Sequence, residues 1–186
     1  MLVETAINGH GKVHAEIMRQ RPFLQVLIAL QRDGFHPESI GGKVYLRSDG
    51  TPGLDYAVSG YVWDGIRDAF IAMSEIQFAS GAKAVAPVHR DAELYHSLDK
   101  VKKAIASLPM ATLKARLFSA HVMGGCPMGE NAAKSVVNSK GRHHEVDNLS
   151  IFDGSVFPTS IAANPMESIF AVTAKFATEL AKVLVM

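Results

Sequence analysis

The sequence has little cysteine, and this scarcity narrows the classes of protein to which the chain can belong. Cys126 is its only cysteine. A single thiol cannot form an internal disulfide, so the fold is not a small disulfide-stapled secreted scaffold. The chemistry of a reducing compartment fits this composition, and we expect a cytoplasmic location.

The chain also lacks a charge excess and a long apolar run. Its 19 basic and 18 acidic residues leave a net charge of +1, which gives no electrostatic basis for binding nucleic acid. The apolar run at residues 23–30 is far too short to cross a bilayer, and the first residues are polar, unlike a signal peptide. We therefore expect no nucleic-acid partner and no transmembrane segment.

Hydrophobic spacing predicts helices along the first two thirds of the chain. Residues 12–31 are typical of a helix, or of a helix followed by a strand, because periodicity does not separate the two in a short apolar run. Apolar residues at helical spacing predict a helix over 64–79 and another over 91–108.

The expected strands are short. Alternating residues at 43–47 predict a half-buried strand, followed by a turn cluster at 48–53 and a partner strand at 54–58. Residues 85–88 and 149–152 are further strand candidates. Together with the helices they predict an α+β (α/β) fold.

The last helix has a well-marked beginning. Asn164 suits the N-cap, Pro165 the first helical position and Glu167 the third position of a capping box. The N-terminal end of a helix carries free N–H groups and a partial positive charge, so it stabilises an anion or an electron-rich ring.

Two further clusters could carry chemistry. His121 precedes a glycine-rich turn, and histidine is the side chain best suited to accept a proton near neutral pH. Asp153-Gly154 follows a strand candidate, a usual place for a backbone contact to a cofactor in an α/β sheet. Each cluster also has an ordinary interpretation, because Asn-Pro is a common helix cap and His-Gly or Asp-Gly a common turn. His143 and His144 are expected to be exposed turn residues.

Two other chemistries use the same residue types. Cys126, His121 and Asn164 supply the members of a cysteine nucleophile site, although the local motifs of cysteine hydrolases are absent. A zinc site at Cys126 and the nearby histidines is less favoured, because the close paired ligand spacing of structural zinc sites is missing.

Several motifs occur in a fixed order over residues 119–182. They are His121-x-x-Gly-Gly-Cys-Pro-Met-Gly, Ser135-Val-Val, Gly141-Arg-x-His-x-Val-Asp-Asn-Leu, Asp153-Gly-Ser-Val-Phe-Pro-Thr and Asn164-Pro. This order resembles the C-terminal signature of the glucose–methanol–choline (GMC) oxidoreductases. Gly125 and Pro127 depart from the Gly-Thr-Cys-Arg-Met-Gly of many relatives. Residues 35–118 match more loosely, with 42–48 as the recognisable strand.

The resemblance implies a division of the chain. Residues 1–118 would be a partial substrate-binding domain, with a sheet and helices. Residues 119–186 would be the catalytic segment that contacts FAD, containing the last strand and helix of the FAD-binding domain.

The resemblance also implies FAD as the cofactor and an alcohol as the substrate. His121 would take the hydroxyl proton and Asn164 would hold the substrate oxygen, while hydride passes to the flavin. The remaining implied contacts to FAD fall on Asp153, Gly154, Pro165 and Met166.

The nucleotide cradle of this family is missing from the sequence. The family binds the ADP half of FAD with a Gly-x-Gly-x-x-Gly turn, and Gly9-His10-Gly11 lacks both the third glycine and a preceding apolar strand. We expect the chain to be a fragment whose N-terminal nucleotide-binding portion is absent. The alternatives are an inactive remnant and a subunit that completes a flavin site on a partner chain.

Overall fold

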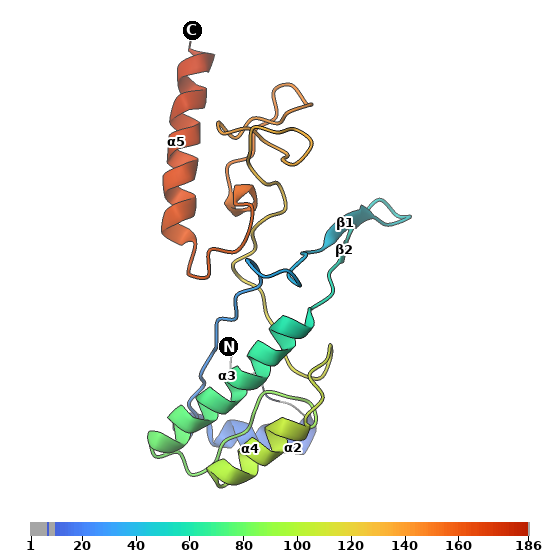
Figure 1. The fold of residues 1–186 in the computed structure, drawn as a ribbon. Coiled ribbons are helices and arrows are strands. Elements are labelled where there is room, and N and C mark those ends of the chain that lie inside the picture. Colours follow the sequence, from blue (N-terminus) through green and yellow to red (C-terminus); the bar gives the residue numbers. More distant parts are fainter. Residues whose placement is uncertain (1–6, 8–9, 186) are drawn as a thin grey trace. The chain divides into compact units, whose positions relative to one another are not determined.

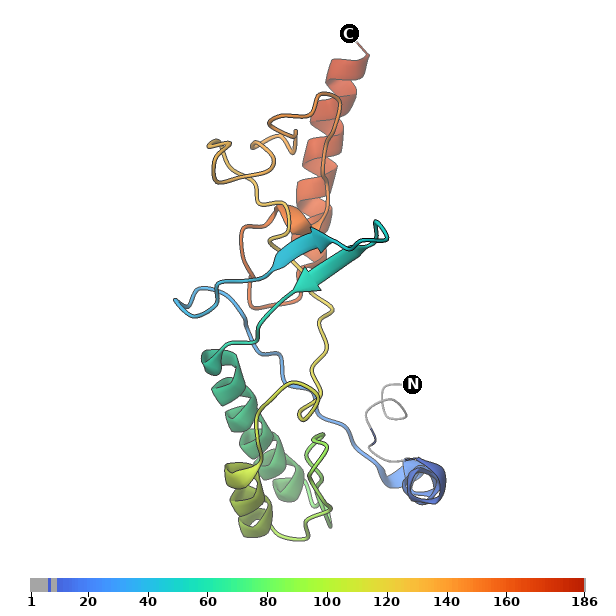
Figure 2. The ribbon, with the colours of Figure 1, turned by 90° about the vertical axis from the view of Figure 1, so that its right-hand side faces the viewer.

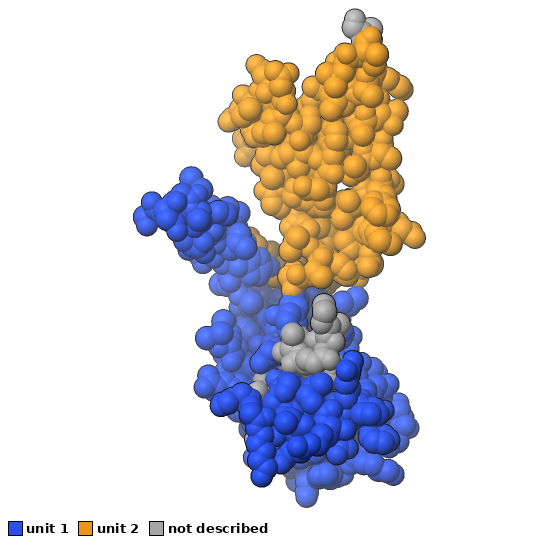
Figure 3. Space-filling model, turned by 180° about the vertical axis from the view of Figure 1, so that it is seen from behind, with its two compact units in different colours: residues 1–31, 42–118 blue, residues 32–41, 119–186 orange. Residues whose placement is uncertain are grey.

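The computed structural model describes residue 7 and residues 10–185. Its contacts divide the chain into two compact units (Figure 3). The first unit comprises residues 1–31 and 42–118, and the second comprises residues 32–41 and 119–186. Helices and one two-stranded sheet make the chain compatible with the expected α+β class. The assignment of the two halves to substrate-binding and FAD-contacting domains stays a prediction.

Two helices form the core of the first unit. Helix α3 (Gly60–Ala79) and helix α4 (Leu98–Ser107) lie side by side in both ribbon views (Figures 1 and 2). The buried residues recur at helical spacing because each helix turns one apolar stripe inward. They are Val62, Ile66 and Phe70 of α3, Val101 and Ile105 of α4, and Ala115.

Polar contacts fix the ends of these helices. The Oγ of Ser59 accepts a hydrogen bond from the Val62 N–H (3.4 Å), as an N-cap does. The guanidinium of Arg67 donates to the carbonyls of Ile105 and Leu108. Because carbonyls at a helix C-terminus lack partners within the helix, this side chain ties α3 to the end of α4.

The helical expectations for this unit are confirmed in part. The helix expected over 64–79 is α3, but the one expected over 91–108 begins only at Leu98. Residues 85–95 instead turn back on themselves, with an isolated bridge between Val85 and Tyr95 in place of a strand. Residues 12–31 contain helix α2 (Gly11–Arg19) and the 3-10 turn η1 (Arg21–Phe23), and 24–31 form no regular element.

Strands β1 (Lys43–Leu46) and β2 (Pro52–Asp55) form an antiparallel hairpin (Figure 2). The partner strand expected at 54–58 begins earlier, at Pro52 within the expected turn cluster, and ends at Asp55. The strand predicted at 43–47 is formed, but its predicted half-burial is wrong, because every residue of β1 is exposed. The ring of Tyr45 lies over Gly53, which is opposite it in the register. A hairpin without further strands or a covering helix has nothing to bury its apolar side chains.

Helix α5 (Met166–Leu184) packs its inner face on the loops of the second unit. Val137, Val156 and Phe176 form this small core, and the rings of Phe152 and Phe176 lie 5.5 Å apart. Thr173 Oγ1 adds a hydrogen bond to the carbonyl of Phe152 (2.7 Å). The residues that these contacts hold against α5 lie in loops and not in strands.

The last strand predicted for this region, at 149–152, is not formed. Its backbone bonds to other loops at single points, such as Ile151 N–H to the carbonyl of Gly141 (2.9 Å) and His143 N–H to that of Leu149 (3.0 Å). Asn148, just before this segment, has a φ of 60°, so a turn leads into it. Among the described residues no helix is both long and apolar enough to cross a membrane.

We predict that Phe176→Ala lowers the stability of the second unit by about 3 kcal/mol, because the side chain is 2 % exposed and leaves a cavity. Val183→Ala on the same helix is the control, since Val183 is 61 % exposed and its loss should cost less than about 0.5 kcal/mol. Native-state hydrogen exchange of the α5 amides measures both. Equal protection in the two variants would contradict this core.

Candidate active site

His121 lies on a loop that is pinned only after the histidine. Cys126 N–H donates to the carbonyl of Ser155 (3.0 Å), Met128 N–H to that of Val156 (2.9 Å) and Gly129 N–H to that of Val137 (2.9 Å). The His121 ring itself makes no hydrogen bond to any other described residue. Its two ring nitrogens are therefore available to a ligand.

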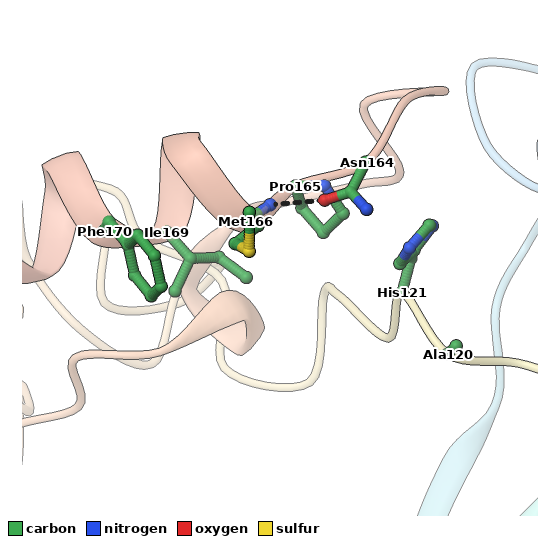
Figure 4. A pocket seen from close by; sticks show the side chains of 7 residues that line it. All are labelled: Ala120, His121, Asn164, Pro165, Met166, Ile169 and Phe170. Carbon is green, nitrogen blue, oxygen red and sulfur yellow. Dashed lines mark hydrogen bonds between the residues drawn. The ribbon is translucent and has the colours of Figure 1, made fainter.

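Asn164 lies just before helix α5, and its side chain accepts a hydrogen bond from the first residue of the helix. The expected start is one residue off, because Pro165 is the N-cap and Met166 is the first helical residue. Asn164 Oδ1 accepts a hydrogen bond from the Met166 N–H (2.9 Å), and the Pro165 carbonyl accepts the helical bond from Ile169 N–H (2.8 Å). With Oδ1 committed to the helix, the amide nitrogen is left to donate elsewhere. Figure 4 shows this nitrogen on the side where His121 lies.

His121 and Asn164 line one shallow depression of about 290 Å³ (Figure 4). The rest of its lining is mostly apolar and consists of Ala120, Pro165, Met166, Ile169 and Phe170. The N–H groups of Glu167 and Ser168, in the first turn of α5, have no hydrogen-bond partner among the described residues. The depression thus combines an imidazole ring, an amide donor and the positive end of a helix dipole.

The six site residues predicted from the sequence are not all brought together. His121, Asn164, Pro165 and Met166 share the depression, and Asp153 and Gly154 lie outside its lining. The apolar wall contributed by Ile169 and Phe170 was missed. Their spacing of three and four residues after Met166 was the available signal.

Asp153 and Gly154 lie beside the depression and hold the backbone around it. The carboxylate of Asp153 accepts hydrogen bonds from the Ser155 N–H (2.8 Å) and hydroxyl (2.5 Å), which begins the 3-10 turn η2 (Gly154–Val156). Gly154 is buried, and a Cβ there would lie 3.0 Å from Ile169 Cδ1 and 3.2 Å from the Val122 carbonyl oxygen. The absence of a side chain therefore lets the His121 loop approach α5.

His144 is not the exposed turn residue expected from the sequence. Its Nε2 lies 3.0 Å from the Gly129 carbonyl oxygen and 2.9 Å from the Oγ of Ser135. A carbonyl only accepts, so Nε2 carries the proton in this arrangement. The half-buried ring thereby holds the end of the glycine-rich loop in place.

The alternative chemistries find no support in the described residues. Cys126 does not line the depression that contains His121 and Asn164. No group of three or more His, Cys, Asp or Glu side chains in the described part of the chain is arranged to hold a metal ion. The carboxylate of Glu130 has a lowered pKa, chiefly through its hydrogen bond to the Ser139 side chain, but it too lies outside this lining.

Comparison with known proteins decides the family. A family model described as GMC oxidoreductase matches residues 37–173, well over half of the chain. The chain belongs to the GMC oxidoreductase family. This confirms the resemblance that the ordered motifs of residues 119–182 indicated.

Relatives of this GMC chain are found in bacteria and plants. It is 27 % identical over 141 residues to an uncharacterized GMC-type oxidoreductase of Sinorhizobium fredii, covering 76 % of the chain and 28 % of that relative. It is 26 % identical over 126 residues to a long-chain-alcohol oxidase of Arabidopsis thaliana, covering 64 % of the chain and 17 % of that relative. A cholesterol oxidase of Acinetobacter baumannii is 33 % identical over 78 residues, covering 40 % of the chain and 14 % of the oxidase. The aligned part therefore spans less than a third of each of these relatives.

We predict that two substitutions of Asn164 distinguish the role of its side-chain oxygen from that of its amide nitrogen. Asn164→Ala removes the acceptor of the Met166 N–H and should destabilise α5 by about 1 kcal/mol. Asn164→Asp keeps an acceptor and adds negative charge at the helix N-terminus, so the stability of α5 should be retained. Thermal unfolding followed by circular dichroism measures both, and an equal loss in the two variants would contradict the capping role.

Proposed function

We propose that this GMC chain contributes the catalytic side of an FAD-dependent site that oxidises an alcohol to a carbonyl compound. The single observation that carries the proposal is the shared depression of His121 and Asn164, in which the histidine ring and the amide nitrogen both lack protein partners among the described residues. The alcohol and cholesterol oxidases among the relatives support an oxidoreductase acting on a hydroxyl group.

The residues around the depression fit a flavin ring. Met166, Ile169 and Phe170 provide an apolar wall on which a flat ring system can lie. The free N–H groups of Glu167 and Ser168 lie in the first turn of the same helix. Since reduction leaves negative charge on the ring, the positive end of α5 would stabilise the reduced form. In this arrangement Pro165 and Met166 would hold the pyrimidine edge.

The chemistry is divided between the cofactor and the chain. When bound, FAD supplies an acceptor for the hydride that leaves the alcohol carbon. His121 takes the proton from the alcohol hydroxyl at one of its unengaged ring nitrogens. Asn164 donates from its amide nitrogen to the same oxygen, and the helix cap at Oδ1 keeps that nitrogen oriented. The two side chains together orient the alcohol for loss of hydride.

The nucleotide half of FAD requires a further portion of protein. We propose that a nucleotide-binding portion, in the same polypeptide or in a partner chain, completes the site, with Asp153 and Gly154 as contacts to FAD. Apolar side chains of α5 support such a cover, because Met166, Phe170, Val183 and Leu184 are 54 % to 76 % exposed. An inactive remnant is the alternative when no such portion is present.

We predict that His121→Ala slows flavin reduction by about a hundredfold or more, as expected for loss of a general base. The measurement is stopped-flow flavin reduction by an alcohol, with the nucleotide-binding portion present. His96→Ala is the matched control, because His96 is an exposed histidine outside the depression. An unchanged rate in His121→Ala would remove the histidine from its proposed role.

We also predict that the 186-residue chain associates when it is alone. Light scattering after size exclusion should give a mass that rises with protein concentration, because the apolar face of α5 is uncovered. Val183→Gln with Leu184→Gln should reduce this association, and Lys182→Gln, a neighbour on the same helix, should not. A clean monomer at all concentrations would argue against a completing portion.

A further inference from the structure

A segment far from the signature in sequence packs on the second unit. Residues 32–41 belong with residues 119–186, although the chain on either side of them belongs to the first unit (Figure 3). The segment reverses direction sharply, since Gly34 has a φ of 154° and Phe35 a φ of 56°. Its turn is closed by a hydrogen bond from Ser39 N–H to the His36 carbonyl (2.9 Å).

Gly34 makes the close contact between this segment and the second unit. It is buried, and a Cβ built on it would collide with Oγ1 of Thr159. The same Cβ would lie 3.3 Å from the backbone nitrogen of Ser160 and 3.4 Å from its Cβ. The backbone of Gly34 therefore lies directly against the chain at Thr159 and Ser160, and only glycine leaves room for this approach.

Thr159 and Ser160 belong to the loop that leads to Asn164. Within the described part of the chain, residues 158–163 make no hydrogen bond to any residue outside this loop. The loop contains one internal bond, from Ala162 N–H to Oγ of Ser160 (3.3 Å), and Ala162 has a φ of 61° that alanine adopts rarely. Packing, and not hydrogen bonding, thus holds the segment that ends at the proposed substrate-binding amide.

We propose that Gly34 is a positioning residue for Asn164. The 158–163 loop packs directly against the backbone of Gly34, a contact that we call the seat. This contact sets where the Asn164 amide lies in the depression. The importance of that position for catalysis rests on the proposed function. The contact between Gly34 and the loop does not depend on the proposed function, because it exists whatever the depression binds.

The experiment compares glycine variants in the full chain by NMR. The side-chain amide signal of Asn164 is assigned by its loss in Asn164→Asp, and the ring signal of His121 by its loss in His121→Ala. Gly34→Ala should shift or broaden the Asn164 amide signal, and Gly41→Ala should leave it unchanged. Gly41 is the matched control, because it lies in the same segment with a φ of 74° and has nothing within 4 Å of an added Cβ.

A second change on the loop side makes the test independent of whether Gly34→Ala folds. Thr159→Ala removes the atom that an added Cβ would meet, so it should partly restore the Asn164 signal when combined with Gly34→Ala. Alone, it loosens the seat and should broaden the same signal. If neither Gly34→Ala nor Thr159→Ala moves the Asn164 amide, the positioning role is overturned.

Flavin reduction separates this inference from the proposed function. With the nucleotide-binding portion present, Gly34→Ala should slow reduction by roughly tenfold to a hundredfold, because small displacements of a positioning group are costly. A shifted Asn164 signal with an unchanged rate would support the seat and contradict the role of Asn164 in catalysis. If the Asn164 signal is unchanged in Gly34→Ala while His121→Ala slows flavin reduction, the proposed function is supported and the role of Gly34 is overturned.

Discussion

The hydrogen bond from the Met166 N–H to Oδ1 of Asn164 is the contact on which the geometry of the depression depends. It begins helix α5 and, in the same step, fixes the side chain whose other end faces the depression (Figure 4). An amide is suited to this double task, because one end accepts and the other donates. A serine or aspartate cap would begin the helix equally well but would leave no N–H to offer.

The first turn of α5 also leaves backbone N–H groups without partners. Pro165 has no N–H, and Met166 gives its own to the cap, so the free donors of the first turn are those of Glu167 and Ser168. These two residues directly follow Met166, whose side chain is apolar. An apolar wall next to unengaged donors favours a flat ligand that gathers negative charge at one edge, and this is the basis on which we propose a flavin.

Local sequence signals predicted this part of the chain well, and nonlocal contacts account for what they missed. The start of α5 could be predicted to within one residue from Asn164 and Pro165, because capping acts over a few residues. The strand expected at 149–152 is not formed, because a strand needs a continuous partner and this segment makes only isolated bonds to other loops. The burial expected for β1 failed for a related reason. Alternation predicts which side chains share a face, but not that another layer covers it.

Two glycines show why residue chemistry alone was a poor guide to the rest of the site. Gly154 lets the His121 loop approach α5, and Gly34 lets a distant segment approach the loop of Asn164. Neither contributes a side chain, so neither stands out in a search for bases, nucleophiles or ligands. Yet His121 and Asn164 lie on loops that hydrogen bonds hold on one side only, and close backbone packing must hold the other. In a unit whose buried apolar core consists of Val137, Val156 and Phe176, the positions that permit such packing constrain the site as strongly as the residues that line it.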